Sequence, residues 1–593
     1  MKRRGTIATA TAAALAALVV TACSSGGTSS TTGTGSSGNN TSANFFNKGL
    51  TQVMNPSTHK GGTVTYESHA APDSFDGGNT YYAWVLNFSR LYEMAMFTYK
   101  SCPGQCGLTL VPRLATDMGT ASADGKTWTF HIQSGVKYEN GSTVTASDVK
   151  YAIERTYDRS VMANGPTYYQ AILTDPTYPG PYKDKSPNKM GLTAIDVPNA
   201  TTLVFHLQAA FPDLPYVLAF PSTAPVPPAS DTGANYQLHP LATGPYKFQT
   251  YQLNKQLTLV PNTAWSASTD PQAKQLASKI VMNLNVNQAN VDNLLLTNQA
   301  QVDAAGVGVG PAAQAKIETN STYKANAVNP INGFARFVYI DTKVAPFTNL
   351  HCREAVEYAA NKTTLQDAWG GPIAGGQIAS TVNPPNIIGF SKFDLYNALS
   401  QPNGDVSDAK TQLQQCGQPN GFSTTMGYRN DNPQETAAAT ALQASLQQVG
   451  IKLTLKGFAG GTYYTSFCGD PAYVHSHSLG LCAGGWGADW PDGYGFLDEL
   501  SNGNAIASTG NTNIEELNDS VINNLFAKAN TETGAARTAI WAQVDHQIMA
   551  DAGILPEVYQ KSLIYVPTSA TNVFVQTYYG MLDYLAIGAS SGS

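Results

Sequence analysis

The alternation of apolar and polar residues marks the first elements of a folded chain. Residues 61–68 (GGTVTYES) and 128–132 (WTFHI) alternate with the period of two that a half-buried strand requires. Between these runs, residues 82–96 carry apolar side chains at helical spacing. A polar, turn-rich run at 76–78 separates the first strand from that helix. The pattern therefore predicts a fold of mixed strands and helices that begins at about Lys60.

The region that follows combines a turn signal with a helix signal. Asp124-Gly125 predicts the tight turn of a hairpin. Thr145, followed three residues later by Asp148, has the arrangement of a capping box, which starts a helix. The predicted helix presents one apolar stripe to the core, formed by Val149, Ala152 and Ile153.

Residues 484–496 (GGWGADWPDGYGF) stand out from the rest of the chain by their glycine density. Glycine loses much backbone entropy on folding and offers no side chain to pack, so a loop is predicted here rather than a helix or a central strand. Asp489 lies between Trp486 and Trp490, with Tyr494 close behind. A carboxylate in such an apolar wall needs a cation, and a cationic ligand group is the expected partner if no lysine or arginine of the chain fills that place. The alternative is a solvated turn with structural tryptophans.

The N-terminus has the features of an export signal. Residues 2–4 are basic, residues 7–20 form a short apolar run, and small residues precede Cys23. The run is too short for a comfortable transmembrane helix. The segment resembles a bacterial lipobox, so residues 1–22 are predicted to be a lipoprotein signal peptide and Cys23 the lipidated first residue. The alternative is a plain signal peptide with an incidental cysteine.

A tract rich in Ser, Thr, Gly and Asn follows from 24 to 43. It has little apolar surface to bury, so it is predicted to be part of a flexible tether over residues 23–59. About 20 such residues would span roughly 25 Å root-mean-square, which lets a folded body move just above a membrane.

The composition suits a soluble exported protein of several domains. Of 593 residues, 13% are charged, and the net charge is -7. A nucleic-acid binder would carry a basic patch, and this balance offers none for phosphate or anionic lipid.

Six cysteines remain after Cys23, an even number that predicts three disulfides in an exported protein, although six cysteines allow fifteen pairings. Spacing favours Cys102 with Cys106 and Cys468 with Cys482, which leaves Cys352 with Cys416. A metal site is the alternative for the last local pair, because His475 and His477 lie between its two cysteines.

Motifs for catalysis are absent or weak, so no enzyme, cofactor or catalytic metal is predicted. Residues 308–313 fit G-x-G-x-x-A, but Pro311 and an exported location count against a dinucleotide. The sequence contains no phosphate-binding P-loop, G-x-S-x-G nucleophile elbow or H-E-x-x-H motif.

Several blocks of the chain resemble the family 5 extracellular solute-binding proteins of ABC importers, the group that includes dipeptide- and oligopeptide-binding proteins. Residues 486–492 (WGADWPD) look like the W-G-x-D-x-x-D segment of that family. The block 110–158 is similar to the family's signature in order and spacing, and 242–252 and 337–365 continue the match. Asp341 and Asn361 depart from the residues usual at their positions. The resemblance covers about 60–574 and is weakest at 162–196.

The resemblance implies an α/β, periplasmic-binding-protein-like two-lobed fold with a hinge and an additional inserted domain (type II, cluster C-like). The implied divisions are lobe I at 60–91, 218–329 and 562–593, an inserted domain at 92–217, and lobe II at 330–561.

The resemblance also implies a function, which is binding without chemistry. The protein would capture a solute, most simply a short peptide, and deliver it to ABC permease subunits whose ATPase subunits work in trans. Asp489 would pair with the peptide's α-ammonium, and Asn79, Thr80 and Tyr81 occupy a turn that approaches ligand in relatives. The protein is expected to be a monomer, lipid-anchored on the outer face of the cytoplasmic membrane. The alternatives are a binding protein for an oligosaccharide or another non-peptide solute, and a lipid-anchored hydrolase.

Overall fold

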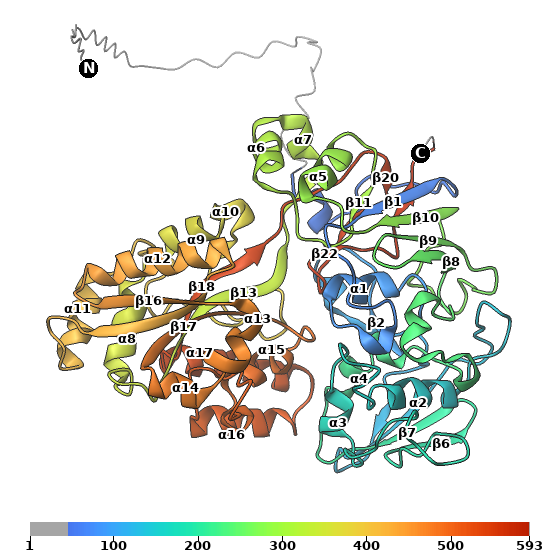
Figure 1. Ribbon diagram of the computed structural model, residues 1–593, viewed down its shortest axis with the longest axis horizontal. Helices are drawn as coiled ribbons and strands as arrows, with labels where there is room; N and C mark the ends of the chain where they lie inside the picture. The colour runs from blue at the N-terminus through green and yellow to red at the C-terminus, as the bar shows by residue number, and fades with distance from the viewer. Residues whose placement is uncertain (1–45, 592–593) are drawn as a thin grey trace, which may run out of the picture. The chain divides into compact units, whose positions relative to one another are not determined.

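The structure, a computed structural model of the chain, describes residues 46–591 (Figure 1). The predicted signal peptide, Cys23 and most of the predicted tether lie outside these residues. No helix within 46–591 is both long enough and apolar enough to cross a membrane.

One body, called lobe I below, is built on a five-stranded mixed sheet in the order β11-β1-β10-β9-β8. In β1, Val64 and Tyr66 are buried as the predicted alternation requires, although the adjacent Glu67 is buried too. The strands are β1 (Thr63–Glu67), β8 (Tyr246–Gln252), β9 (Gln256–Pro261), β10 (Lys279–Asn283) and β11 (Val302–Asp303). Three helices follow β10 in the chain: α5 (Gln288–Leu296) before β11, and α6 (Pro311–Thr319) and α7 (Ser321–Ala325) after it.

A four-stranded antiparallel sheet, β4-β5-β7-β6, shares one core with lobe I. Asp124-Gly125 forms the predicted turn between β4 and β5, with Gly125 at φ 68°. The capping box of Thr145 and Asp148 starts α2, as predicted. The elements are β4 (Thr120–Ala121), β5 (Thr127–His131), β6 (Ile195–Asn199), β7 (Thr202–His206), α2 (Ala146–Arg155), α3 (Tyr168–Ile172) and α4 (Leu214–Val217).

The helix predicted over 82–96 is shorter, since α1 ends at Ser89 (Ala83–Ser89). The Arg113 guanidinium donates hydrogen bonds to the carbonyl oxygens of Arg90 and Glu93, at 2.8 and 2.9 Å. These two carbonyls thus bond to a side chain from a later segment instead of continuing a helix. The chain then turns into β2 (Phe97–Tyr99), which pairs with β3 (Leu110–Pro112).

The second body, called lobe II, is built on a six-stranded sheet in the order β14-β18-β13-β17-β15-β16. Alternate residues of β13 face two different cores, Phe337 and Tyr339 on one side and Val338 and Ile340 on the other. The strands are β13 (Ile331–Ile340), β14 (Gln377–Ile378), β15 (Ser423–Arg429), β16 (Lys452–Phe458), β17 (Leu479–Gly487) and β18 (Ile554–Lys561).

Helices cover both faces of this sheet, which gives lobe II three layers (Figure 1). One face carries α8 (Leu350–Ala359), α9 (Lys362–Trp369), α11 (Val406–Gln415) and α12 (Pro433–Gln447). The other carries α14 (Pro471–Ser476), α15 (Gly493–Ser501), α16 (Ser520–Ala529) and α17 (Gly534–Ala550). Both faces are therefore buried, as in sheets whose connections are helical.

The packed part of the chain begins before Lys60, so residues 46–59 are not a tether as their composition suggested. A short helical turn at Lys48–Leu50 opens this stretch, and Met54, 4% exposed, forms a β-bridge with Val573. The apolar Met54 side chain finds its partner more than five hundred residues away in sequence, which a local reading of polarity cannot anticipate.

Three disulfides join Cys102 to Cys106, Cys352 to Cys416, and Cys468 to Cys482. These are the three pairs that spacing predicted. Cys468 and Cys482 are thus unavailable as thiolate ligands, which removes the metal site considered for them together with His475 and His477.

Candidate ligand site

The segment 484–496 is largely regular structure, which corrects the predicted loop. Its first four residues end β17, a central strand paired with both β13 and β15, and α15 begins at Gly493. A β-carbon at Gly484 would lie 2.3 Å from the Tyr339 ring, and one at Gly487 would lie 2.7 Å from the Phe334 ring. Glycine in this strand therefore makes room for aromatic rings, and the loop proper is residues 488–492.

Asp489 lies in this short loop, and tyrosines from lobe I and its attached sheet surround it. The Tyr81 hydroxyl donates a hydrogen bond to the Asp489 carboxylate. The Tyr168 hydroxyl is 2.6 Å from that of Tyr81, and the Tyr578 hydroxyl donates to the Asp489 carbonyl oxygen at 2.7 Å. Phenol groups from three separated segments therefore converge on one residue, with Tyr81 on its carboxylate and Tyr578 on its backbone carbonyl.

Among the described residues, the Asp489 carboxylate has no cation of its own. None of the ion pairs within residues 46–591 includes it, and its charge is met by neutral phenol donors. Burial raises its pKa to about 7, the Tyr81 and Tyr168 hydroxyls work in the opposite sense, and the nearby Glu499 raises it further. The group is thus a partly buried acid that a cation would convert to a stable carboxylate.

Two cavities open on either side of Asp489. The larger, about 490 Å³, lies between the residues around α1 of lobe I and the ends of β13, β17 and β18. Its walls include large aromatic side chains: Tyr81, Tyr82, Trp84, Phe220, Phe334, Tyr578 and Tyr579. A cavity of this size, with apolar walls and few polar groups, is typical of a small-molecule site.

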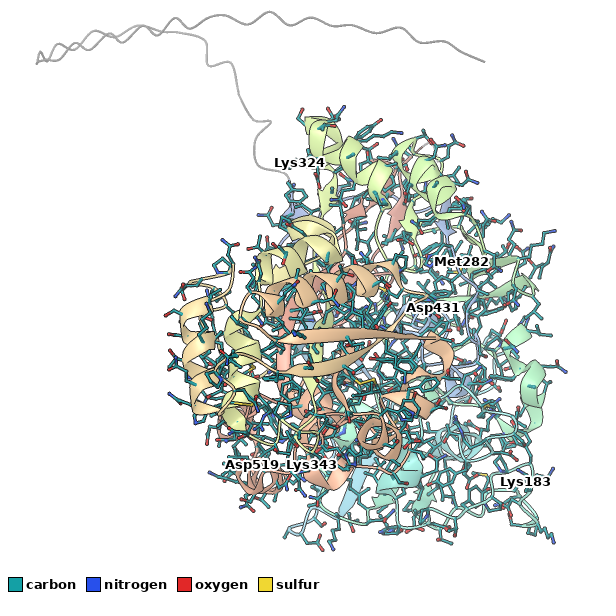
Figure 2. All side chains as sticks on the ribbon, turned by 60° about the vertical axis from the view of Figure 1, so that its left-hand side comes forward. Lys183, Met282, Lys324, Lys343, Asp431 and Asp519 are labelled. Carbon is teal, nitrogen blue, oxygen red and sulfur yellow. A yellow bond between two sulfur atoms is a disulfide. The ribbon has the colours of Figure 1, made fainter. Side chains whose placement is uncertain are left out.

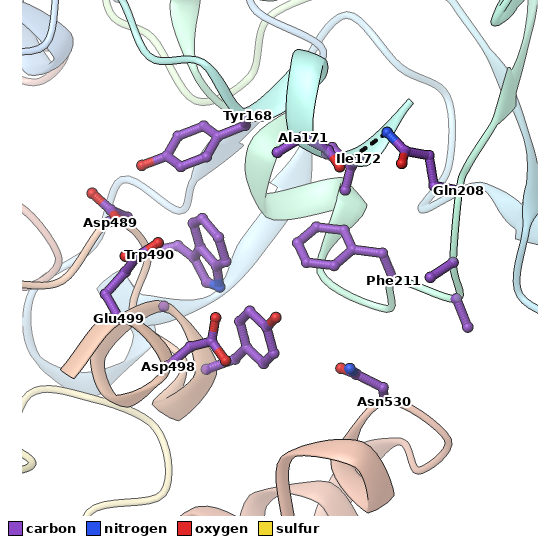
Figure 3. A pocket seen from close by; sticks show the side chains of 14 residues that line it. Tyr168, Ala171, Ile172, Gln208, Phe211, Asp489, Trp490, Asp498, Glu499 and Asn530 are labelled. Carbon is purple, nitrogen blue, oxygen red and sulfur yellow. Dashed lines mark hydrogen bonds between the residues drawn. The ribbon is translucent and has the colours of Figure 1, made fainter. Parts of the chain in front are cut away.

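The smaller cavity, about 290 Å³, lies on the side of Trp490 and Tyr494 (Figure 3). The Tyr168 ring reaches over Asp489 with its hydroxyl toward the carboxylate, and Phe211 faces Trp490 across the space. Asp498 and Glu499 add two further carboxylates to this wall. The cavity combines aromatic faces with acids, a lining that suits a basic group.

Trp490 is an inter-lobe contact, buried to 4% exposure in the lobe I core. Its indole N–H donates to Asp213 Oδ2 at 2.9 Å. Asp213 also pairs with Arg537 of α17 at 2.7 Å, and Arg537 pairs with Asp492 at 3.0 Å. The short loop therefore carries both a carboxylate that lines the two cavities and an attachment between the lobes.

The other predicted site residues are distributed differently. Trp486 packs in the lobe II core, where its indole nitrogen lacks a hydrogen-bond partner among the described residues. Tyr494 lies parallel to Trp490 with ring centroids 6.4 Å apart and lines the smaller cavity. Asn79 accepts a hydrogen bond from the Asn164 amide, and Thr80 donates one to Asp73. Of these four, Tyr494 lines a cavity and the others support the surrounding chain.

Several cavity residues escaped the sequence analysis. Tyr168 falls in the stretch where the family resemblance is weakest, and Tyr578 and Tyr579 form an aromatic pair in the C-terminal segment. An aromatic pair is a weak signal, because most tyrosines serve cores. Phe334, 41% exposed at the end of β13, carried no signal of its own.

Arg336 lies behind the larger cavity. Its Nε donates to Gln560 at 3.0 Å, and its guanidinium lies 5.2 Å from the Phe334 ring centroid, so it contacts two residues of the cavity wall. Burial lowers its pKa. Within residues 46–591 no ion pair includes it. It is a partly buried cation that lies against the rings of Phe334 and Trp369 and has no carboxylate partner among the described residues.

Comparison with known proteins shows which proteins this chain is similar to. Residues 109–508 match the family described as bacterial extracellular solute-binding proteins, family 5 Middle. The glutathione-binding protein GsiB of Escherichia coli O1:K1 / APEC is 26% identical over 345 residues, which are 58% of this chain and 60% of GsiB. The probable D,D-dipeptide-binding periplasmic protein DdpA of Escherichia coli K12 is 23% identical over 489 residues, 81% of this chain and 84% of DdpA.

Solved structures extend the comparison to the whole fold. The clavulanic acid biosynthesis oligopeptide binding protein 2 is 35% identical and superposes with a TM-score of 0.87, covering 92% of this chain and 98% of that one. The protein thus has the two-lobed α/β fold that the sequence predicted. With GsiB, by contrast, the alignment spans 60% of the relative's length.

Proposed function

Since this chain belongs to family 5 of the bacterial extracellular solute-binding proteins, we propose that it captures a solute outside the cytoplasm and delivers it to an ABC transporter, without chemistry. The observation that carries the proposal is a partly buried carboxylate, Asp489, that lines two cavities and has no cation partner within residues 46–591. Burial between lobes strengthens each polar contact with the ligand, because water is excluded.

We propose a short peptide as the ligand. Peptides share an ammonium, amides and a carboxylate while their side chains vary, so one acid can hold the constant end and roomy aromatic walls can accept the rest. The names of the relatives, which bind glutathione, D,D-dipeptides and oligopeptides, favour the same class. An oligosaccharide is the second candidate, since aromatic faces such as Tyr82 and Trp84 also stack on sugar rings.

In this proposal Asp489 pairs with the α-ammonium and Arg336 with the carboxylate. Arg336 lies opposite Gly485 in the β13–β17 ladder, four residues before Asp489. The four residues from Gly485 to Asp489 span at most about 13 Å, and an extended peptide advances roughly 3.3–3.6 Å per residue. A ligand of about three or four residues would therefore reach from one charge to the other.

The ammonium assignment predicts that Asp489→Asn weakens peptide binding at least about a hundredfold, because removing one partner of a buried ion pair costs roughly 3–5 kcal/mol. The experiment is calorimetric titration of wild type and variant with a tripeptide, its N-acetylated form and its C-terminally amidated form. Wild type should bind the acetylated peptide poorly, and the variant should barely distinguish the two. The amidated peptide tests Arg336 in the same way, with Arg336→Gln as the matched variant.

Two results would contradict this assignment. Equal binding of free and acetylated peptides by wild type would rule out the α-ammonium as the partner of Asp489 and would favour a sugar or another solute as the ligand. A variant with lower thermal stability and unchanged affinity would make Asp489 a turn residue. Hydrolysis of the peptide during the titration would instead support the hydrolase alternative.

We further propose that the protein is a monomer held on the outer face of the membrane by a lipid on Cys23, a residue outside the described part of the chain. The support is a short apolar run that ends in small residues before this cysteine. Cys23→Ala should move the protein from the membrane fraction into the medium, as judged by immunoblotting of both fractions. Unchanged fractionation would contradict the anchor.

A further inference from the structure

Three side chains that can bind metal meet in lobe II, away from the cavities around Asp489. Asp341 directly follows β13, His475 lies on α14, and Glu516 lies between α15 and α16. One potential ligand atom from each lies within 4.8 Å of the others, and His475 Nε2 is 2.6 Å from Glu516 Oε2. Figure 2 labels Lys343 and Asp519, which follow Asp341 and Glu516 in the chain, at the same end of lobe II.

One oxygen of the Asp341 carboxylate accepts hydrogen bonds from the described residues, and the other accepts none. Its Oδ1 accepts hydrogen bonds from the backbone amides of Lys343 and Val344, at 2.7 and 3.1 Å. Its Oδ2 is buried and lacks a partner among the described residues, while the residue is 3% exposed. Leaving a buried carboxylate oxygen unpaired is costly, so this atom calls for a donor or a cation.

A further acid, Glu515, precedes Glu516 in the chain, and burial raises its pKa well above the ordinary value, with Asp341 acting in the same direction. Glu515 is buried, and both of its carboxylate oxygens are without partners among the described residues. Burial raises the pKa of Asp341 to about 6, with Glu516 acting in the same direction and His475 against it. Among the described residues, Glu516 forms an ion pair with His475, whereas Asp341 and Glu515 form none.

The backbone holds the three groups together. The Thr342 amide donates to the Glu515 carbonyl oxygen at 2.9 Å, and the Thr342 hydroxyl donates to the Glu516 carbonyl oxygen at 3.1 Å. Glu516 has a φ of 51°, in the left-handed region that residues with a β-carbon seldom adopt. Strain of this kind is retained at functional sites more often than elsewhere.

We propose that Asp341, His475 and Glu516 form a binding site for a divalent transition metal ion, with Zn²⁺ as the best fit. One imidazole nitrogen and two carboxylate oxygens are ligands that Zn²⁺ accepts at about 2.0–2.2 Å. In a tetrahedral site, ligands at that distance lie about 3.3–3.6 Å apart, so His475 and Glu516, now 2.6 Å apart, would separate and the three side chains would readjust around the ion. Two carboxylates and a neutral imidazole balance the ion's charge.

A bound ion would link three segments of lobe II that are distant in sequence. His475 is solvent-exposed, so the ion has a route of entry and can keep a water molecule as its fourth ligand. Binding to the folded state stabilises it by mass action, because the three residues are dispersed in the unfolded chain.

The test is calorimetric titration of ZnCl₂ into chelator-treated, fully oxidised protein at pH 7.5, with thermal unfolding followed with and without zinc. Wild type should bind one ion with a Kd in the micromolar range or tighter, and its Tm should rise. His475→Ala should weaken binding at least tenfold and abolish the Tm rise. The matched control is His477→Ala, an exposed histidine that stacks on Tyr473 with ring centroids 3.9 Å apart, which should behave as wild type.

A wild type that binds no zinc at 100 µM would overturn the proposal. Equal losses of zinc affinity in His475→Ala and His477→Ala would also overturn it, because they would indicate non-specific binding by surface histidines. Asp341→Asn supplies a second test, since it preserves shape and removes the charge. If that variant folds poorly, the visible absorption of bound Co²⁺ provides the second test instead. Co²⁺ bound to wild type should give visible bands that His475→Ala lacks, and their absence from wild type would count against the site.

Discussion

Asp489 is a side chain whose protonation depends on its surroundings. In the free protein the carboxylate is partly buried beside the hydroxyls of Tyr81 and Tyr168, and burial raises its pKa to about 7. In the unfolded chain an aspartate titrates near 3.9. The folded state therefore prefers the protonated acid, and this group's contribution to stability falls as the pH rises from about 4 to about 7. A cationic ligand reverses that preference, because it pairs with the carboxylate.

Peptide affinity should consequently depend on pH. Below about pH 7 a proton competes with the ammonium, so the Kd should rise about tenfold for each unit that the pH falls, and binding should release a proton. Above about pH 8 the peptide's own ammonium loses its charge, and affinity should decline again. Titrations at pH 5.5, 6.5 and 7.5 in buffers of different ionisation enthalpy measure both quantities.

Asp489→Asn is the control for this pH dependence. Its residual affinity should vary less between pH 5.5 and 7 than that of wild type; the remaining variation would come from Asp498 in the wall of the smaller cavity, whose pKa burial raises to about 6. A wild type whose affinity is equal at pH 5.5 and 7.5 would mean that Asp489 is already ionised before ligand arrives.

Among the elements, β17 most directly shapes the site. It is a central strand whose last four residues include three glycines, and it delivers the chain into the loop at 488–492. Ordinary strand propensity argues against such a sequence. The rings of Tyr339 and Phe334 occupy the space that side chains would fill, so packing decides the outcome.

Gly484→Ala should therefore destabilise the protein by about 1–3 kcal/mol, the usual range for overpacking a core. A β-carbon there would lie 2.3 Å from the Tyr339 ring, which is itself buried. Gly461→Ala is the control, because its β-carbon would meet nothing within 4 Å. Urea unfolding of both variants measures the difference, and equal stabilities would show that the Tyr339 ring can move aside.

In the molecule as a whole, the two lobes are joined by an uncommon arrangement of charges. Arg537 of lobe II pairs with Asp492 of its own lobe and with Asp213 across the interface. Its pKa is raised chiefly by these two carboxylates, which outweigh the effect of burial. One guanidinium thus pairs with two buried carboxylates, one from each side of the interface.

Arg537→Gln should shift the ligand-free protein toward a form with separated lobes. The two buried acids would repel each other, and losing one member of a buried charge pair costs roughly 3–5 kcal/mol. Small-angle X-ray scattering should report a larger radius of gyration than for wild type. Arg429→Gln is the control, because Arg429 pairs with Glu435 inside lobe II. Identical scattering from the two variants would contradict a role for Arg537 in closure.

Local chemistry was sufficient for a large part of this protein. The hairpin at Asp124-Gly125 and the capping box of Thr145 depend on residues within a few positions of one another, so sequence predicted both. The pairing of Cys102 with Cys106 follows from proximity in the same way. Asp489 could be chosen because a carboxylate between tryptophans is unusual in any context.

The surroundings of Asp489 depended on the tertiary structure. Tyr81, its hydrogen-bond donor, is 408 positions away in the chain, and Tyr168 and Tyr578 come from two further segments. The two tryptophans beside the carboxylate have opposite surroundings, Trp486 in the lobe II core and Trp490 in that of lobe I. Neither composition nor periodicity separates them, because burial depends on which surfaces the folded chain brings together, and that is a property of long-range packing rather than of neighbours in sequence.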